Sequence, residues 1–290
     1  MPHICPIVLR PYSPSRSAFL QAKRRLLNLR IAAYSPVSRI AAFLLHKMAA
    51  LSDRMPRLVI PQTEIVSWGT IWAGTTKGNG NPKPSNCFDK KQGMDFGTLF
   101  DRAFGQAISS MLGGIPVVRP DNDALLPPQP DCVEVGKTRI VGGIRAQNFD
   151  AAYRPDGPRI VYDSKTLNDT KSIQKNWQNM VNDLATEAST VHTRFPYCIV
   201  AFIVLFPRPA LASNQERNLI RTLERLGSRK DELDQTHLAE AIAMIIWDPV
   251  TGRIDPDVPA AESVLRLDTI QERIYPHYKD RYQNLPPHDV

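Results

Sequence analysis

The chain has 290 residues, of which 42% are hydrophobic and 22% are charged, and this composition is typical of a globular protein with its own core. Its four cysteines lie far apart and show no Cys-x-x-Cys or His/Cys ligand spacing, which argues against a zinc site and against a disulfide scaffold. Unpaired cysteines suit a reducing compartment, so we expect a cytoplasmic protein. The apolar run Ile40–Leu45 is too short to span a membrane, and no membrane association is expected.

Positive charge is concentrated at the N-terminus. Residues 1–54 hold nine Lys and Arg and one acid, a net charge of +8, which leaves −1 of the total +7 for residues 55–290. Net charge therefore gives no support for nucleic-acid binding by the body of the chain. The first 54 residues fit three interpretations: a flexible basic arm, an organelle transit peptide, or translated sequence before a true start at Met48 or Met55. Residues 55–290 are expected to form the functional domain.

The first half of this body alternates loops with one clear helix. Residues 76–92 are rich in Gly, Asn, Pro and Lys and predict a loop. Apolar residues at a spacing of three and four then predict a helix over residues 95–112, which Gly113-Gly114 ends. A proline-rich connection follows, and then three short segments with strand character at residues 139–144, 148–154 and 158–167.

The second half holds the strongest strand signal. A long helix is predicted at residues 170–193, followed by Tyr197–Phe206, a nearly continuous apolar run that suits a strand buried on both faces. Further elements are expected as helices at 214–226 and 233–243 and a strand at 244–247, with a peripheral tail after Pro276. The order helix, three strands, helix, strand predicts an α/β fold with a mixed β-sheet flanked by helices.

Two of the predicted strands form a hairpin around the turn Pro155-Asp156-Gly157-Pro158. Proline presets φ, and Asp-Gly tolerates the positive φ that a tight hairpin needs, so we take Asp156-Gly157 as a two-residue loop. This register places Asp150 directly opposite Asp163, and cross-strand partners point to the same face. Lys165, two residues further along, shares that face by strand alternation. A longer loop would shift the register and separate the two aspartates.

Such a set of residues has a defined chemistry. Two neighbouring carboxylates repel each other and need a compensating cation. Hard oxygen ligands suit Mg²⁺, which can polarise a phosphodiester and lower the pKa of a bound water. A lysine beside the metal can orient that water and offset charge in the transition state. We therefore predict Asp150 and Asp163 as metal ligands and catalytic residues, and Lys165 as a catalytic residue.

This constellation resembles the PD-(D/E)xK nuclease superfamily, which includes most type II restriction endonucleases. Asp150 is similar to the first acid of the motif, although Phe149 stands where proline is usual, and Asp163-Ser164-Lys165 is similar to the (D/E)xK element. Upstream, Gly97-Thr98-Leu99-Phe100-Asp101 resembles the Gly-x-x-Phe-Glu context of an acid on the first core helix. The resemblance implies a restriction-endonuclease-like α-β-β-β-α-β core over about residues 93–206 and a catalytic role for Asp101.

A polar stretch follows Lys165 at the beginning of the next predicted helix. Backbone N–H groups at a helix N-terminus, with lysines beside them, suit a phosphate backbone. We therefore predict DNA contacts by four side chains at this position: Lys171, Gln174, Lys175 and Asn176.

The leading hypothesis is a Mg²⁺-dependent type II restriction enzyme that acts as a homodimer on double-stranded DNA, since cutting both strands of a palindrome calls for two-fold symmetry. One alternative keeps the fold but makes the chain a repair nuclease or junction resolvase. Another is a non-catalytic DNA- or protein-binding module. A structural alternative also stays open, in which Asp163 and Lys165 are an exposed ion pair on a hairpin edge and Asp101 is a surface residue.

Overall fold

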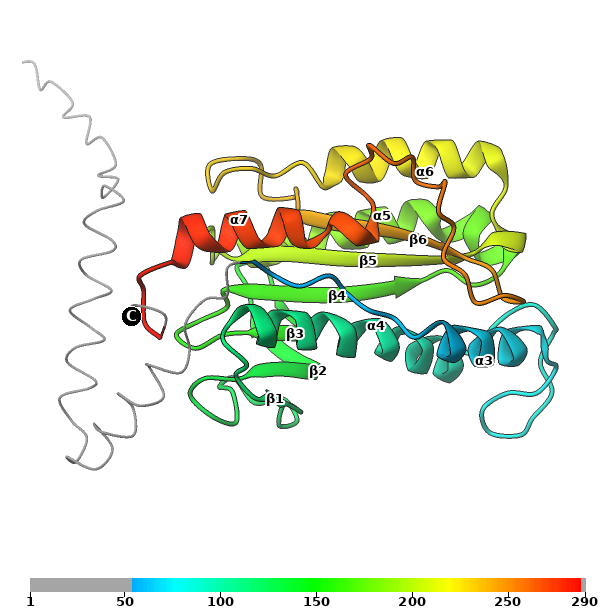
Figure 1. Ribbon diagram of the computed structural model, residues 1–290, viewed down its shortest axis with the longest axis horizontal. Coiled ribbons are helices and arrows are strands. Elements are labelled where there is room, and N and C mark those ends of the chain that lie inside the picture. The colour runs from blue at the N-terminus through cyan, green and yellow to red at the C-terminus, as the bar shows by residue number, and fades with distance from the viewer. Residues whose placement is uncertain (1–53, 288–290) are drawn as a thin grey trace, which may run out of the picture. The chain divides into compact units, whose positions relative to one another are not determined.

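The computed structural model describes residues 54–287 (Figure 1), so the predicted extension at residues 1–54 lies outside the described residues, apart from Arg54. Within this range six strands form one mixed sheet, and five helices pack around it. The predicted α/β class is thereby confirmed. Among residues 54–287 no helix is long and apolar enough to cross a membrane.

The sheet keeps chain order, so each strand lies beside its neighbour in sequence. Three strands form an antiparallel meander, and the third of them begins a parallel half of the sheet. The short first strand runs parallel to the second at the edge. The strands are β1 (Val117–Val118), β2 (Val133–Val141), β3 (Ala146–Tyr153), β4 (Ile160–Thr166), β5 (Ile199–Pro207) and β6 (Ala241–Trp247).

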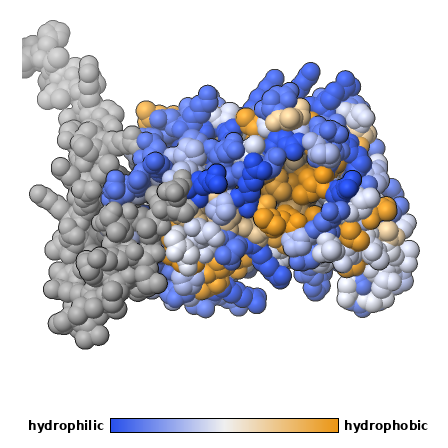
Figure 2. All heavy atoms as spheres, viewed as in Figure 1, coloured by the Kyte–Doolittle hydropathy of each residue, from blue (hydrophilic) through white to orange (hydrophobic). Residues whose placement is uncertain are grey.

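Helices cover both faces of this sheet (Figure 1). On one face lie α5 (Thr170–His192) and α6 (Ser213–Leu226), whose apolar residues share one core cluster with the strands. On the other lie α3 (Gln62–Ala73), α4 (Lys90–Met111) and α7 (Gln271–Tyr282). Figure 2 shows that the outward sides of α6 and α7 are mostly hydrophilic, as expected for amphipathic helices that pack on a sheet.

Helix α4 begins five residues before its predicted start. Asp89 caps the helix: its carboxylate accepts a hydrogen bond from the Gln92 amide at 2.9 Å, and the Gln92 side chain accepts one from the Asp89 amide at 3.1 Å. This capping box stabilises the first turn in spite of its polar composition. The predicted apolar stripe is buried further along, and Phe104 stacks on Tyr162 of β4 with ring centroids 4.1 Å apart.

The apolar run predicted as a central strand is β5, and all nine of its residues are buried. Its neighbours β4 and β6 both run parallel to it. Because helices cover both faces of the sheet, the side chains on both sides of β5 are buried, and polar residues need not alternate with apolar ones along the strand. This prediction is confirmed.

Two sequence predictions near the C-terminus are wrong. The helix expected at residues 233–243 is absent: Leu233 is 91% exposed, and the carboxylate of Asp234 binds the amides of Lys230 and Asp231 in a turn. The apolar residues from Ala241 onward belong to β6 instead. The tail is not peripheral either, because α7 runs through Pro276 and buries Tyr278 and Tyr282.

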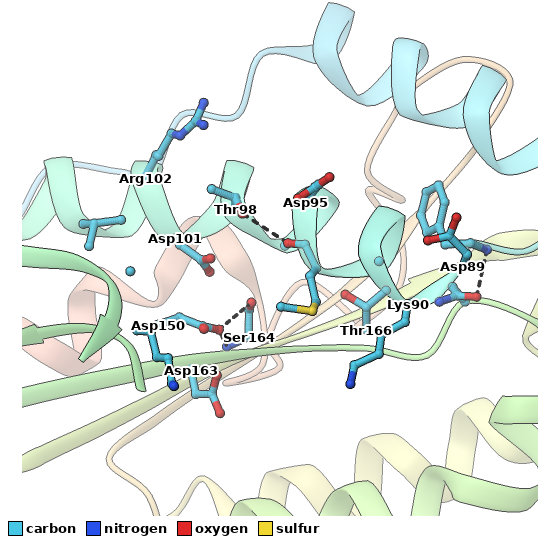
Figure 3. A pocket seen from close by; sticks show the side chains of 18 of the residues that line it. Asp89, Lys90, Asp95, Thr98, Asp101, Arg102, Asp150, Asp163, Ser164 and Thr166 are labelled. Carbon is cyan, nitrogen blue, oxygen red and sulfur yellow. Dashed lines mark hydrogen bonds between the residues drawn. The ribbon is translucent and has the colours of Figure 1, made fainter. Parts of the chain in front are cut away.

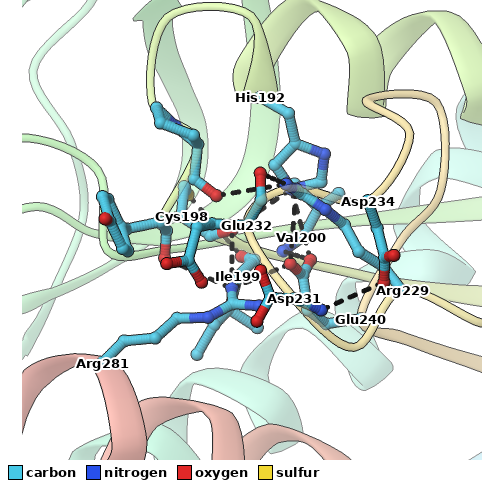
Figure 4. A network of polar contacts seen from close by, with 12 residues as sticks. His192, Cys198, Ile199, Val200, Arg229, Asp231, Glu232, Asp234, Glu240 and Arg281 are labelled. Atoms are coloured by element: carbon cyan, nitrogen blue, oxygen red, sulfur yellow. Dashed lines mark hydrogen bonds and ion pairs between the residues drawn. The ribbon is translucent and has the colours of Figure 1, made fainter. Parts of the chain in front are cut away.

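A buried polar network ties these C-terminal elements to the sheet (Figure 4). Glu240, directly before β6, is fully buried and accepts hydrogen bonds from the Val200 amide at 2.9 Å and from Arg281 Nη1 at 2.8 Å. His192 Nε2 lies 3.3 Å from the same carboxylate and Arg229 Nη1 lies 3.6 Å from it. Burial alone would raise the pKa of Glu240, but His192, Arg281 and the Val200 amide together lower it to about 2.

Candidate active site

The predicted hairpin register is confirmed where β3 and β4 pair. Ala151 lies opposite Tyr162, and the ladder continues toward the turn through two further pairs. Beyond Ala151 the strands part, because β3 continues along β2 while β4 continues along β5. Asp150 and Asp163 are the first residues past the last pair. We call this place the β3/β4 fork, formed by residues 147–150 of β3 and 163–165 of β4.

Ser164 bridges the fork. Its backbone N–H and its hydroxyl both donate to Oδ2 of Asp150, at 2.9 and 3.0 Å. Asp150 also lies opposite an irregularity in β2, where the register shifts between Val135 and Thr138 and Gly136 adopts a φ of 130°. A bulge of this kind bends the strand and re-aims the side chains beside it. The Asp150 carboxylate is thus held in place from β4.

Asp101 reaches the same place from α4. It is only 7% exposed, and its Oδ1 is buried without a hydrogen-bond partner among the described residues. Gly97, one turn earlier, allows the helix to approach: a Cβ there would lie 2.9 Å from the Ser164 hydroxyl. In Figure 3, Asp101 and Asp150 point toward one another across Ser164, with Asp163 beside Asp150. The three carboxylates thus come from three different elements and line one cavity.

These carboxylates are buried close to each other, which shifts their pKa values. Burial, and then the charge of Asp150, raises the pKa of Asp101 well above its usual range. Burial and the charge of Asp163 do the same to the pKa of Asp150. Burial also raises the pKa of Asp163, but its hydrogen bond with Asp150 and the charge of Lys165 limit the rise, so that it stands at about 6. Without a bound metal ion, these carboxyl groups therefore hold their protons to a higher pH than ordinary aspartates do.

Lys165 lies on the side of β4 that faces α5. Its Nζ donates to Asp163 and, at 2.8 Å, to Oε1 of Glu187. The predicted proximity of Asp163 and Lys165 is therefore present, and this pair is largely buried rather than an exposed hairpin edge. Lys165 does not, however, line the cavity with the three aspartates, because its ammonium is turned toward α5. Sequence reasoning missed Glu187. The signal was a charged residue inside the buried stripe of the long helix, between Leu184 and Val191.

The cavity in front of the aspartates has a volume of about 860 Å³. It extends from the beginning of α4 to the bulged part of β2 and the beginning of α5. Its wall carries basic side chains that sequence reasoning did not single out: Lys90, Arg102, Arg119 and Lys137. These side chains could hold an anionic substrate beside the carboxylates.

The four residues predicted to contact DNA do not line this cavity. All four are exposed on the first turns of α5: Lys171, Gln174, Lys175 and Asn176. The predicted anion site at this helix N-terminus is also partly occupied, because the Asp169 carboxylate accepts hydrogen bonds from the amides of Lys171 and Ser172 at 2.9 and 3.0 Å. Any contact with DNA here would come from the exposed side chains.

The donor set bears on whether the site can hold a metal ion. Over residues 54–287, no group of three or more His, Cys, Asp or Glu side chains is arranged to hold a metal ion. Mg²⁺ needs fewer, since it keeps several waters and binds through one or two carboxylates. The unpartnered Oδ1 of Asp101 and the mutual repulsion around Asp150 are the features that a small divalent cation would relieve. In this respect the residues fit Mg²⁺.

Comparison of the chain with protein-family models, with curated proteins and with solved structures gives no significant match. The distinctive features of the site are the β3/β4 fork, the three aspartates and the lysine held beside Asp163.

The raised pKa of Asp101 leads to a prediction about stability. Folding raises the pKa of this carboxyl, so its protonated form is the one that the folded state accommodates. Its contribution to stability is fully present below the ordinary pKa of an aspartate and is lost as the pH rises through the raised pKa. Asp101→Asn stays neutral, so in metal-free protein at pH 8 it is expected to raise the free energy of unfolding by about 1 kcal/mol or more. At pH 4 the difference is expected to vanish. Urea unfolding with a chelator at both pH values measures this, and equal effects at both would contradict it.

Proposed function

We propose that this chain is a Mg²⁺-dependent deoxyribonuclease of the PD-(D/E)xK type, acting on double-stranded DNA in the manner of a type II restriction enzyme. The observation that carries the proposal is the β3/β4 fork, where Asp150 and Asp163 meet with Lys165 beside them. Asp101, brought from the preceding helix, adds a third carboxylate at the place the resemblance implies.

The order of elements supports the same proposal. Apart from the two-residue strand β1 between α4 and β2, helix α4, strands β2, β3 and β4, helix α5 and strand β5 follow one another as α-β-β-β-α-β, the order that the resemblance implies for a restriction-endonuclease core. Strands β2, β3 and β4 are antiparallel, and β5 joins β4 in parallel. Two departures from the motif remain, with Phe149 in place of proline and Asp101 in place of glutamate. Neither removes an oxygen ligand.

In the proposed reaction, Asp150 and Asp163 would hold Mg²⁺, with Asp101 adjacent. When bound, the metal would polarise the scissile phosphodiester and lower the pKa of a coordinated water. Ser164 keeps the Asp150 carboxylate in place through its two hydrogen bonds. The ammonium of Lys165 offsets negative charge that develops on the phosphate and orients the attacking water.

The cavity wall would hold the substrate. The basic side chains of the wall come from elements around the aspartates and would bind successive phosphates of one strand: Lys90, Arg102, Arg119 and Lys137. The exposed Lys171 and Lys175 would extend this contact. One site cuts one strand, so cleavage of both strands calls for a homodimer with two-fold symmetry.

Incubation of purified protein with long mixed-sequence DNA and Mg²⁺, followed by fragment mapping, tests the proposal. Discrete fragments that disappear with a chelator are expected for a restriction enzyme. Nicking confined to branched or damaged DNA would instead identify a repair nuclease or junction resolvase. Retention of DNA without hydrolysis in any divalent metal would contradict the nuclease proposal and favour a binding module.

A further inference from the structure

The side chain that contacts Lys165 from α5 lies in an unusual place for a charge. Glu187 is 3% exposed and belongs to the buried face of α5. Its neighbours on that face are the apolar Leu184, Ala188 and Val191. An apolar side chain of similar volume could fill this position without the cost of removing a charge from water. The carboxylate is therefore best explained by what it holds.

Glu187 binds both sides of the β3/β4 fork through one oxygen. Oε1 accepts a hydrogen bond from Lys165 Nζ of β4 at 2.8 Å and another from Gln147 Nε2 of β3 at 3.0 Å. Oε2 is buried and has no hydrogen-bond partner among the described residues. Lys165 brings a cationic donor to this carboxylate, whereas Gln147 brings a neutral amide, so the lysine is the stronger partner.

The lysine side chain is long and flexible, and by itself it would not keep one position beside Asp163. Its ammonium is held between two carboxylates, one on its own strand and one on the helix that covers it. Because α5 is anchored to the sheet by a buried apolar stripe, Glu187 is a fixed reference point for the ammonium. Asp163 alone offers a single anchor on the same strand.

We infer that Glu187 is a positioning residue for this site: it holds the ammonium of Lys165 beside Asp163, the carboxylate through which that charge acts on the cavity. The inference rests on the proposed nuclease function. Neither Glu187 nor Lys165 is among the residues that line the cavity, whereas Asp163, which Lys165 contacts, does line it. Its effect on the reaction passes through Lys165.

The test compares Glu187→Gln, which keeps shape and an acceptor oxygen but removes the charge, with the wild-type chain under steady-state cleavage of an oligonucleotide duplex in Mg²⁺. We expect kcat to fall about a hundredfold while KM stays the same, because misplacing one catalytic group affects the transition state. Asp183→Asn, an exposed residue one turn earlier on α5, removes the same charge and is expected to leave kcat unchanged.

Two further variants separate the possible outcomes. Gln147→Leu removes the neutral partner of Glu187 and is expected to change kcat less than threefold. A loss as large as that of Glu187→Gln would overturn the inference, because it would mean that Glu187 acts by linking β3 to β4 and not by placing Lys165. In a Lys165→Ala background, Glu187→Gln is expected to add no further loss, and an additive loss would overturn it. If Lys165→Ala itself cleaves normally, the proposed function fails; if it is inactive while Glu187→Gln is fully active, only the inference fails.

Discussion

Replacing Asp163 by asparagine is expected to reduce Mg²⁺-dependent cleavage of plasmid DNA by about a thousandfold. The substitution keeps the size of the side chain and one acceptor oxygen for Lys165, but it removes from the fork a charge that we propose binds Mg²⁺. DNA binding should persist, because the basic wall of the cavity is unchanged. Conversion of supercoiled plasmid to nicked and linear forms measures the activity, and a gel-shift assay in Ca²⁺ measures the binding.

Two controls make this result interpretable. Asp183→Asn removes one exposed carboxylate from α5 and should cleave like the wild type. The Asp163→Asn protein should unfold at the same or a higher denaturant concentration, because it relieves repulsion with Asp150 and Glu187. Undiminished cleavage by a folded Asp163→Asn protein would mean that the fork is not the catalytic centre.

The largest effect on stability is expected for Glu240→Ala, at about 3–5 kcal/mol lost from the free energy of unfolding. Removing this carboxylate leaves the guanidinium groups of Arg229 and Arg281 buried without their counter-charge. It also leaves the Val200 amide without its acceptor. Urea unfolding at neutral pH measures the loss, and Glu272→Ala, an exposed glutamate on α7, should change stability by no more than about 0.5 kcal/mol.

The contribution of Glu240 to stability also depends on pH. Its pKa is lowered from an ordinary value of 4.5 to about 2, so its contribution is fully present above pH 4.5 and is lost as the pH falls toward 2. The difference in stability between wild type and Glu240→Ala should therefore shrink as the pH falls through this window. A difference that stays constant from pH 7 to pH 2.5 would show that the network does not act through the charge of Glu240.

Local sequence chemistry predicted the part of the fold that matters most for the site. The register predicted from the turn Pro155-Asp156-Gly157-Pro158 is the one that β3 and β4 adopt, and the proximity of Asp150 and Asp163 followed from it. The two-residue loop itself is not formed, since the pairing ends at Tyr153 and Ile160 and residues 154–159 connect the strands. The continuous apolar run correctly marked β5 as the buried centre of the sheet. In both cases the deciding interactions lie within a few residues of chain.

Predictions failed where distant contacts decide the structure. Residues 233–243 have an apolar spacing that suits a helix, but the apolar residues from Ala241 pair with β5, and Glu240 is held by His192 and Arg281. Helix α7 contains Pro276, and its burial depends on tyrosine contacts with the sheet. Glu187 was missed for the same reason, since its partners lie 22 and 40 residues away in sequence.

The bond between Ser164 and Asp150 has a consequence for how this protein can change over generations. At the fork, the Ser164 amide has lost β3 as a backbone partner, and the Asp150 carboxylate takes its place. Losing that carboxylate leaves a part-buried donor without its protein acceptor, a cost of about 0.5–1.5 kcal/mol, in addition to any loss of function. Asp101, in contrast, has a buried carboxylate oxygen without a hydrogen-bond partner among the described residues and is repelled by Asp150. A lineage released from selection for activity should therefore replace Asp101 first and keep Asp150 longest, as a remnant that serves the sheet alone.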